Sequence, residues 1–303
     1  MAIKDYFLEG MQQGWNVVNA TTLKQDMVID ADVIIVGTGA GGGTSAEIMA
    51  QAGLRVVMVE DGPLKTSTDF KMDEIEAYLT LYQDGGARTT KDAAISILQG
   101  RAVGGTTVIN WTSSFRTPTP TLEHWNNAHN ITGLSENEMA PWFDLMEKRL
   151  NVGQWIVPPN KNNSLLQQGC EKLDWQWKTI PRNVKGCWDL GYCGMGCPTN
   201  AKQSMLVTTI PGALKNNAQL IYRARAEQFN FTGDRVTSVT CRALEGDGVQ
   251  TTGKTITVRG QYFISAAGAI NGPGLLLRSK IPDPYQLIGK RTFVHPVVAS
   301  FAV

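Results

Sequence analysis

The feature that most constrains this chain is a glycine-rich turn placed directly between a β-branched segment and a helix-forming segment. Residues 31–42 read ADVIIVGTGAGG, and Thr44–Ala52 favours a helix. A strand, a glycine turn and a helix in this order form the first half of a dinucleotide-binding unit. Gly37 permits the tight turn, Gly39 lets the backbone approach a pyrophosphate, and Gly42 lets the helix pack closely on the strand.

The next strand strengthens this interpretation. Gly53 ends the helix, residues 54–59 read LRVVMV, and Glu60 follows at the carboxyl end of that strand. An acidic residue about 20 positions after the glycine turn is where such folds bind the adenosine ribose. Its negative charge would repel a 2′-phosphate, which favours FAD or NAD over NADP. The sequence therefore predicts a βαβ nucleotide cradle formed by Gly37, Gly39, Gly42 and Glu60.

A second glycine-rich segment favours flavin over nicotinamide. Gly100–Asn110 reads GRAVGGTTVIN. Gly104 and Gly105 allow backbone contact with a planar ring, while Thr106 and Asn110 offer side-chain hydrogen bonds. The alternative is a plain β-turn, because Gly-Gly pairs mark turns in many folds.

The downstream half of the chain returns to the first sheet. Three strands are predicted as a meander: Gln219–Ala224, Arg235–Arg242 and Thr255–Arg259. Tyr262–Ala266 is then an apolar strand that leads to Gly268, and residues 269–279 favour a helix. A nucleotide domain interrupted by a long insertion is ordinary among two-domain flavoproteins, by fold analogy. The predicted fold class is α/β: an FAD-binding, Rossmann-like parallel sheet with a β-meander insertion, plus the beginning of an α+β substrate domain.

Four segments together resemble the glucose-methanol-choline (GMC) oxidoreductase family: ADVIIVGTGAGGG, VVMVEDG, LQGRAVGGTTVINW and ISAAGAINGPGLLLRS. They are spread over nearly the whole chain, and GRAVGGTT is the most specific. The last segment departs from the family pattern, because Gly272 stands where Thr or Ser is usual and Lys280 where Gly is usual. Within the family, the chain is most similar to bacterial alcohol dehydrogenases that carry a cysteine-rich GYCGMGCP segment.

This resemblance implies FAD as cofactor and oxidation of the CH–OH group of an alcohol by hydride transfer to flavin N5. It places the residues of the cradle at the pyrophosphate and ribose, and further residues at the rest of FAD: Gly104, Gly105, Thr106 and Asn110 along the flavin, the backbone of Ala226 at the adenine, and Gly268 at the end of the returning strand. No histidine occupies positions 100–115, so we expect noncovalent FAD. The family's catalytic base, a His paired with a second His or Asn, is expected beyond Val303, and His295 is interpreted as a strand residue.

Three cysteines form a separate cluster in the sequence. Cys187, Cys193 and Cys197 are interleaved with glycines, and three readings stay open: a structural loop, an iron–sulfur cluster, or a zinc or redox site. The spacing is not a standard one for a cluster, and the adjacent cysteine pair of cluster-bearing relatives is missing. No histidine lies between Gln154 and Ile210 to complete a zinc site. The structural loop is the main expectation.

The amino-acid composition limits the classes of binding partner that are expected. The chain has 28 Lys and Arg against 27 Asp and Glu, a formal charge of +1, which argues against nucleic acid and anionic membranes as partners. Neither an export signal nor an apolar run of about 20 residues is present, so the expected location is the cytoplasm. The partners expected are a small-molecule alcohol and, for a dehydrogenase, an electron-acceptor protein.

The expected organisation has four parts: a helical extension at 1–30, an FAD-binding domain at 31–150 and 200–285, a cysteine-containing insertion at 151–199, and the start of a truncated substrate domain at 286–303. On this interpretation the chain is an N-terminal fragment, inactive alone, of a GMC alcohol dehydrogenase or oxidase. Two alternatives remain: a nicotinamide-dependent dehydrogenase, and a noncatalytic electron-transfer subunit that uses flavin or an iron–sulfur cluster.

Overall fold

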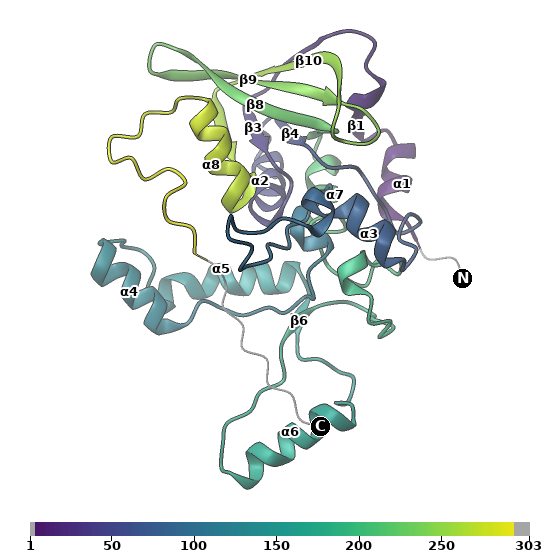
Figure 1. Ribbon diagram of the computed structural model, residues 1–303, viewed down its shortest axis with the longest axis vertical. Helices are drawn as coiled ribbons and strands as arrows, with labels where there is room; N and C mark the ends of the chain where they lie inside the picture. The colour runs from purple at the N-terminus through teal and green to yellow at the C-terminus, as the bar shows by residue number, and fades with distance from the viewer. Residues whose placement is uncertain (1–3, 294–303) are drawn as a thin grey trace. The chain divides into compact units, whose positions relative to one another are not determined.

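The structure is a computed structural model that describes residues 4–293 and divides into two compact units (Figure 1). Unit 1 comprises the chain up to Gln13 and residues 65–212, and unit 2 comprises residues 14–64 and the chain from Ala213 onward. This division differs from the boundaries expected from sequence, because residues 65–150 group with the cysteine-containing segment.

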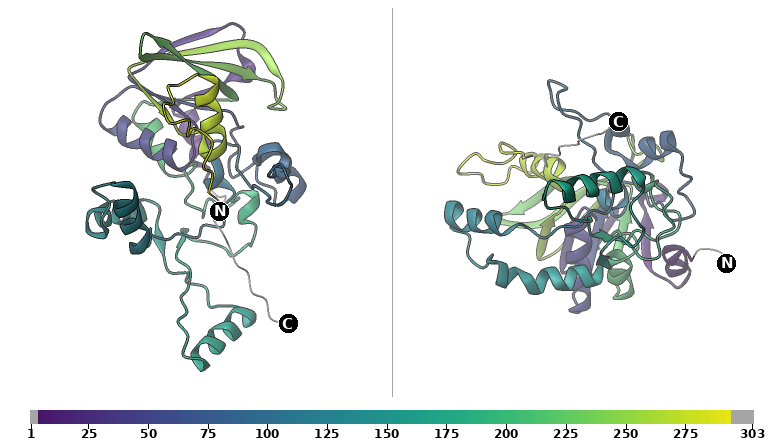
Figure 2. Two further views of the ribbon diagram at one scale, coloured as in Figure 1. Left: turned by 60° about the vertical axis from the view of Figure 1, so that its left-hand side comes forward. Right: turned by 90° about the horizontal axis from the view of Figure 1, so that it is seen from below.

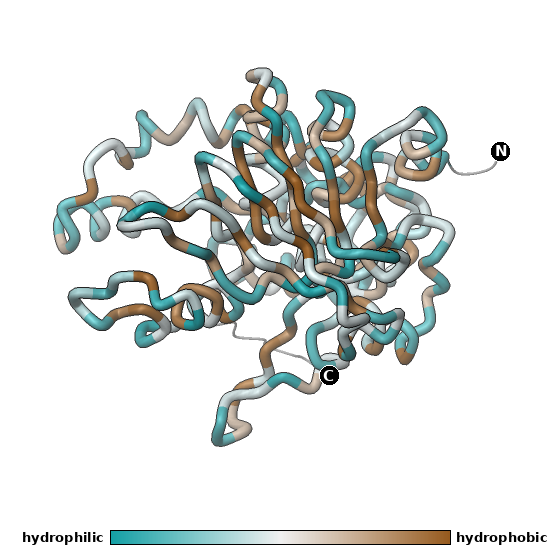
Figure 3. Tube along the Cα trace, turned by 90° about the horizontal axis from the view of Figure 1, so that it is seen from above, coloured by the Kyte–Doolittle hydropathy of each residue, from teal (hydrophilic) through white to brown (hydrophobic). Residues whose placement is uncertain are grey.

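Unit 2 is built on a five-stranded parallel sheet with the strand order β1-β7-β4-β3-β11. The strands are β1 (Asn16–Asn19), β3 (Val33–Val36), β4 (Val56–Glu60), β7 (Gln219–Tyr222) and β11 (Tyr262–Ser265). Ile34 lies opposite Val57 on one side and Phe263 on the other. Every residue of β3 and β4 is buried. Parallel strands covered on both faces are apolar along their whole length, and the central strands in Figure 3 show this.

Two helices follow strands of this sheet. α2 (Ala40–Gln51) connects β3 to β4, and α8 (Gly268–Arg278) follows β11. The predicted returning strand and the helix after it are thereby confirmed. α2 begins four residues before the predicted Thr44, since its first turn contains the glycines of the turn motif. First-turn N–H groups have no partner within the helix, so the low helix propensity of glycine costs little there.

A second sheet has the order β2-β10-β9-β8, with β2 (Met27–Asp30), β8 (Ala224–Thr232), β9 (Arg235–Leu244) and β10 (Thr251–Arg259). The prediction that Gln219–Ala224 opens the meander is wrong. Most of that segment is β7 of the parallel sheet, and the meander begins with β8. Arg223 separates the two strands with a φ of 58°, so the chain changes direction without the glycine that would have marked the turn.

Residues 1–30, expected to be a helical extension, contain both helix and strand. α1 (Tyr6–Gln12) is present, and the side chain of Asp5 caps it by accepting from the N–H groups of Phe7 and Leu8. β1 and β2 follow, and each pairs in parallel with a strand from the far end of unit 2. The N-terminal segment therefore contributes an edge strand to both sheets.

The core of unit 2 lies between its two sheets. Ile34, Val57 and Ile221 belong to the same buried cluster as Cys241 of β9 and Ile256 of β10. In Figures 1 and 2 the ribbon of β8, β9 and β10 lies on one side of β3 and β4, and α2 lies on the other. Burial raises the pKa of the Cys241 thiol to about 12, so this cysteine behaves as a small apolar residue.

Unit 1 has short elements joined by long segments. Its helices are α1, α3 (Glu74–Leu81), α4 (Thr119–His129), α5 (Glu136–Arg149) and α6 (Lys161–Lys172), with 3₁₀ turns η2 (Gln83–Gly86), η3 (Gly105–Val108) and η4 (Cys193–Met195) and a small β5 (Val152–Gly153) and β6 (Arg182–Asn183) pair; α7 (Thr209–Lys215) crosses the division. Every residue of α5 and α6 is at least partly exposed. Within residues 4–293, no helix has the length and apolar character needed to cross a bilayer.

The different burial of two isoleucines in unit 2 predicts unequal effects for the same substitution. Ile34→Ala removes a fully buried side chain and should lower the free energy of unfolding by about 2–5 kcal/mol. Ile48→Ala on α2, where the side chain is 53% exposed, should change it by less than about 0.5 kcal/mol. Urea denaturation measures both, and equal midpoints for the two variants would contradict this description of the core.

Candidate functional site

The glycine turn of unit 2 is a place where three backbone segments touch. Gly37 has a φ of 96°, and a Cβ atom there would lie 2.5 Å from the carbonyl oxygen of Ala266. A Cβ atom on Gly42 would lie 1.9 Å from the carbonyl oxygen of Gly37. Both distances are far below van der Waals contact, so only glycine permits this approach of the turn, α2 and the end of β11.

Two helices begin at this edge of the sheet. α2 has Gly39 as its N-cap, so no side chain caps its first N–H groups. Such a helix start can bind a phosphate through backbone donors and the helix dipole. α8 begins at Gly268, whose φ is 79°. Two residues earlier, the Ala266 N–H donates to Val36 O at 2.8 Å. The two helix starts therefore follow neighbouring strands, β3 and β11.

Glu60 lies at the carboxyl end of β4 and is 7% exposed. Its Oε2 accepts from the N–H and the hydroxyl of Thr38, at 3.0 and 2.7 Å, and its Oε1 accepts from Gly62 N–H at 2.9 Å. Burial raises the pKa of the Glu60 carboxyl, and these three donors act in the opposite direction.

The carboxylate of Glu60 can accept a further hydrogen bond from a ribose hydroxyl. A carboxylate has about four acceptor positions, and Thr38 and Gly62 use three of them. The remaining position on Oε1 can accept one ribose hydroxyl, and rotation of the Thr38 hydroxyl would release a second. The glycine turn, the uncapped start of α2 and the acceptor of Glu60 thus fit the diphosphate and ribose of a dinucleotide.

Ala226 lies beside a β-bulge in β8. The pairing of β8 with β9 shifts between Ala226 and Gln228, so Glu227 is the extra residue. Arg278 of α8 donates to the carbonyl oxygens of Ala226 and Glu227, at 3.4 and 3.1 Å. The strand starts just after β7, whose Tyr222 lies opposite Glu60. Ala226 is thus on the same edge of unit 2 as the cradle, and its role at the adenine stays a prediction.

The second glycine segment folds in unit 1 as a tight loop followed by η3. Gly104 has a φ of 100°, and a Cβ atom on it would lie 2.7 Å from Val108 Cγ2; Gly105 follows with a φ of 56°. The Thr106 hydroxyl accepts from Gly100 N–H, and Asn110 Oδ1 accepts from Thr112 N–H. These two side chains therefore hold the loop itself, and contact of these four residues with flavin stays a prediction.

Two residues of these sites were not anticipated from sequence. Thr38 fixes the Glu60 carboxylate. Its position between Gly37 and Gly39 was the sequence feature that could have indicated this role. Lys202 is 3% exposed, and its ammonium donates to three backbone carbonyls of unit 1. Burial lowers the pKa of Lys202 to about 8, although the thiols of Cys193 and Cys197 act to raise it. Its spacing along the sequence carried no signal of this role.

Each of the three clustered cysteines accepts a hydrogen bond from a different donor. Cys187 Sγ accepts from Asp189 N–H, Cys193 Sγ from the Arg182 guanidinium, and Cys197 Sγ from Lys202 N–H. All five cysteines of the chain are free thiols. Among residues 4–293, no three His, Cys, Asp or Glu side chains gather closely enough to hold a metal ion. An iron–sulfur cluster therefore has no support in this structure.

The two histidines of the described residues belong to unit 1, whereas the cradle belongs to unit 2. His124 and His129 lie on exposed α4 in unit 1, with ring centroids 5.5 Å apart in an edge-to-face arrangement. His295 lies outside the described residues. The expectation that the catalytic base lies beyond Val303 stays a prediction.

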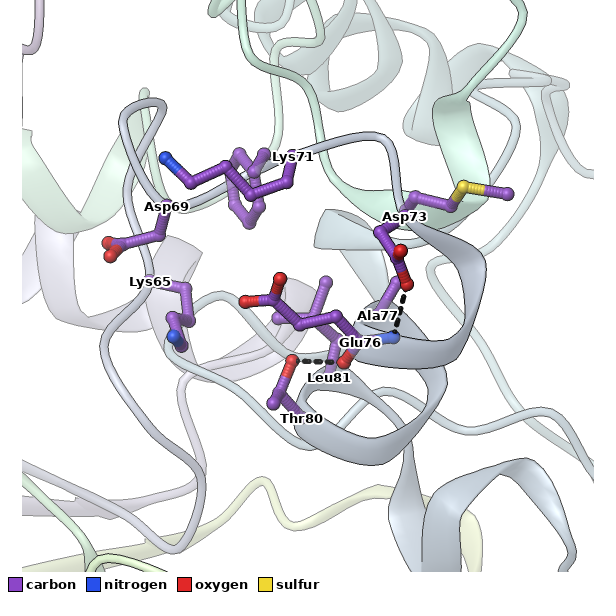
Figure 4. Close-up of a pocket in the computed structure, with 10 residues that line it drawn as sticks. Lys65, Asp69, Lys71, Asp73, Glu76, Ala77, Thr80 and Leu81 are labelled. Atoms are coloured by element: carbon purple, nitrogen blue, oxygen red, sulfur yellow. Dashed lines mark hydrogen bonds between the residues drawn. The ribbon is translucent and has the colours of Figure 1, made fainter.

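Unit 1 also has a small hollow that is distinct from the predicted site (Figure 4). It lies between residues 65–73 and α3, and its walls carry the lysines Lys65 and Lys71 and the acids Asp69, Asp73 and Glu76. Opposite charges largely cancel there. The lining residues differ from all predicted cofactor-binding residues, so this hollow is not the candidate site.

Comparison with known sequences identifies the family. The profile described as GMC oxidoreductase matches residues 78–297, which is more than half of the chain. The chain belongs to the GMC oxidoreductase family. This confirms the resemblance inferred from the four sequence segments.

Several relatives match over most of this chain. A long-chain-alcohol oxidase of Arabidopsis thaliana is 33% identical over 279 residues, which is 90% of this chain and 37% of the relative. A GMC-type oxidoreductase of Mycobacterium tuberculosis is 33% identical over 89% of this chain and 42% of its own length. This member of the GMC family thus spans less than half of the length of these relatives.

A solved structure supports the fold. An FAD-dependent oxidoreductase from Chaetomium thermophilum superposes with a TM-score of 0.60 at 16% identity, covering 83% of this chain and 48% of that one. At this identity the likeness concerns architecture alone. It agrees with the predicted α/β fold with a parallel sheet.

The glycine contacts predict opposite effects for two neighbouring substitutions. Gly42→Ala places a methyl group against the Gly37 carbonyl and should lower the free energy of unfolding by at least about 2 kcal/mol. Gly41→Ala meets no atom within 4 Å and should raise it by about 0.4–1 kcal/mol, because alanine loses less backbone freedom on folding. Thermal unfolding without added nucleotide tests this. A Gly42→Ala protein as stable as the parent would mean that the turn is not closed as described.

Proposed function

We propose that this chain is the FAD-binding part of an oxidoreductase that acts on the CH–OH group of an alcohol. The observation that carries the proposal is the cradle of unit 2, where a glycine-only turn, the uncapped start of α2 and a carboxylate aligned by Thr38 meet at one sheet edge. Membership of the GMC family supports the same cofactor and reaction class.

The residues of unit 2 bind and orient the cofactor in this proposal. The N–H groups at the start of α2 bind the pyrophosphate, with Gly37, Gly39 and Gly42 leaving room for it. Glu60 accepts from the adenosine ribose, the backbone at Ala226 meets the adenine, and Gly268 starts the second helix at the phosphate edge. The bound FAD would supply the hydride acceptor, flavin N5.

The segment Gly100–Asn110 keeps its proposed place along the flavin. Its loop is held internally by Thr106 and Asn110. Gly104 is buried in the turn, and the partly exposed backbone at Gly105 is the part that we place against the ring. No histidine lies in this segment, which favours noncovalent FAD. A protein contributes to flavin chemistry by holding the cofactor in one orientation, and a rigid loop beside the ring would do so.

The alcohol substrate is proposed from the relatives. Four of the matched Arabidopsis thaliana proteins are named long-chain-alcohol oxidases, and a paromamine 6′-oxidase of Streptomyces fradiae also matches. We infer a hydroxyl-bearing substrate for the whole protein. Either oxygen or an electron-acceptor protein would then reoxidise the flavin.

We expect the purified chain to bind FAD, and Glu60→Gln to weaken this binding about 10–100-fold, since a hydrogen bond to a charged acceptor contributes about 1.5–3 kcal/mol. In glutamine an NH₂ group replaces one carboxylate oxygen. That NH₂ group would face the N–H donor of either Thr38 or Gly62, and one hydrogen bond would be lost. Quenching of flavin fluorescence on titration measures the affinity.

The matched control is Glu245→Gln, the same change at an exposed glutamate of unit 2. It should bind FAD as the parent does. Binding of NADH together with a lack of FAD binding would instead favour a nicotinamide-dependent dehydrogenase. Equal FAD affinity for the parent and Glu60→Gln would remove Glu60 from the site.

The substrate proposal is tested on the protein encoded by the whole gene. Primary alcohols of increasing chain length should reduce its bound flavin without added nicotinamide cofactor, as bleaching of the visible flavin absorbance. Oxygen consumption compared with reduction of an artificial dye then distinguishes an oxidase from a dehydrogenase. An FAD-loaded protein whose flavin no alcohol reduces would contradict the assigned reaction.

A further inference from the structure

Lys202 holds an unusual position in unit 1. It follows the cysteine segment, is 3% exposed, and donates from Nζ to Val108 O at 2.8 Å, Asn110 O at 2.6 Å and Cys193 O at 2.6 Å. An ammonium group has three N–H donors, so all of them are used. We call this arrangement, the Lys202 ammonium with the carbonyls of Val108, Asn110 and Cys193, the carbonyl clamp.

The clamp holds the C-terminal end of η3, where the hydrogen bonds within the helix end. η3 runs from Gly105 to Val108, and the last carbonyls of any helix lack partners within it. Lys202 supplies partners for Val108 and Asn110, which lie 94 and 92 positions before it in the chain. The backbone directly after Gly104 and Gly105 is therefore held by a residue that is distant in sequence.

Arg182 supports the same segment from a second direction. Its Nε donates to Thr112 Oγ1 at 2.8 Å, and its Nη2 donates to Trp111 O and to Cys193 Sγ. Thr112 is fully buried and has a φ of 64°. A non-glycine residue keeps this conformation only where its surroundings impose it. Two cations therefore hold residues 108–112 in one conformation.

The cysteine segment supplies the remaining acceptor of the clamp. η4 presents the Cys193 carbonyl to Lys202, and the next carbonyl, of Gly194, accepts from the buried Tyr82 hydroxyl at 2.8 Å. A Cβ atom on Gly194 would lie 2.9 Å from the Trp111 ring. The turn around Cys193 is thus fitted closely against the segment that follows the second glycine motif.

We propose that Lys202 is a positioning residue for the flavin, whose ammonium fixes the backbone of residues 105–112 against the cysteine segment so that a rigid surface meets the ring. The proposal rests on the proposed FAD function. Lys202 acts through the backbone that it holds, and the cysteine segment serves as the support for that backbone.

Removal of the side chain and its replacement by a soluble amine test the clamp. Lys202→Ala should raise amide hydrogen exchange in residues 108–112 about tenfold without cofactor, while exchange in unit 2 stays unchanged, because only local hydrogen bonds are lost. In the FAD-loaded protein, the same variant should keep bound FAD but show an altered visible circular dichroism of the flavin.

Added propylammonium matches the part of the side chain that alanine lacks and should restore both signals. Tetramethylammonium carries the same charge without N–H donors and should restore neither. Lys185→Ala, at an exposed lysine, is the control and should match the parent in both measurements. If Lys202→Ala does not fold, Lys202→Met, which keeps most of the side-chain volume, takes its place and should show the same two changes.

Exchange in residues 108–112 that matches the parent would overturn the clamp, as would an increase spread equally over both units. Rescue by tetramethylammonium would show that charge, not hydrogen bonding, is what matters, and would also overturn it. Increased exchange with an unchanged flavin spectrum would reject the positioning role. If the parent protein binds no FAD, the proposed function fails, and the exchange measurement still decides whether the clamp exists.

Discussion

The close backbone contact between Gly37 and Ala266 is the constraint on which unit 2 depends. It occurs where β3 ends beside β11, so the start of α2 and the start of α8 are placed along one edge of the parallel sheet. The contact between Gly42 and the Gly37 carbonyl then sets how closely α2 lies on β3. A side chain at either glycine would separate these elements, and the geometry proposed to bind phosphate would be lost with them.

Glu60 in unit 2 and Lys202 in unit 1 are buried charged groups that are held mainly by backbone atoms. In unit 2, two N–H groups and one hydroxyl point to the Glu60 carboxylate. In unit 1, three carbonyls accept from the Lys202 ammonium. A buried charge that loses such partners is strongly destabilised, so each of these groups favours a single arrangement of the turns around it. Both lie next to a glycine-rich segment, where the backbone would otherwise be free to adopt several conformations.

Much of the nucleotide fold was predictable from sequence, because its requirements are local. Gly42 contacts the Gly37 carbonyl within the same motif, and Gly37 makes a turn with a positive φ. The apolar runs of β3 and β4 identify buried parallel strands. β1 and β2 were not predictable, because they are four-residue strands whose partners lie about 200 residues away in the chain. β8 was misplaced because Arg223 makes a turn that glycine usually makes. Lys202 was missed for a related reason, since nothing local distinguishes a buried lysine from an exposed one.

Cys241 offers a natural probe of one unit alone. The other four cysteines belong to unit 1 and are partly accessible, whereas Cys241 is fully enclosed in unit 2, where burial raises the pKa of its thiol to about 12. Alkylating reagents act on thiolates, so they would label Cys241 only when the two sheets separate. The rate at which the fifth thiol becomes labelled would therefore report the opening of the nucleotide-fold unit without any engineered marker, and a tightly bound dinucleotide would slow it.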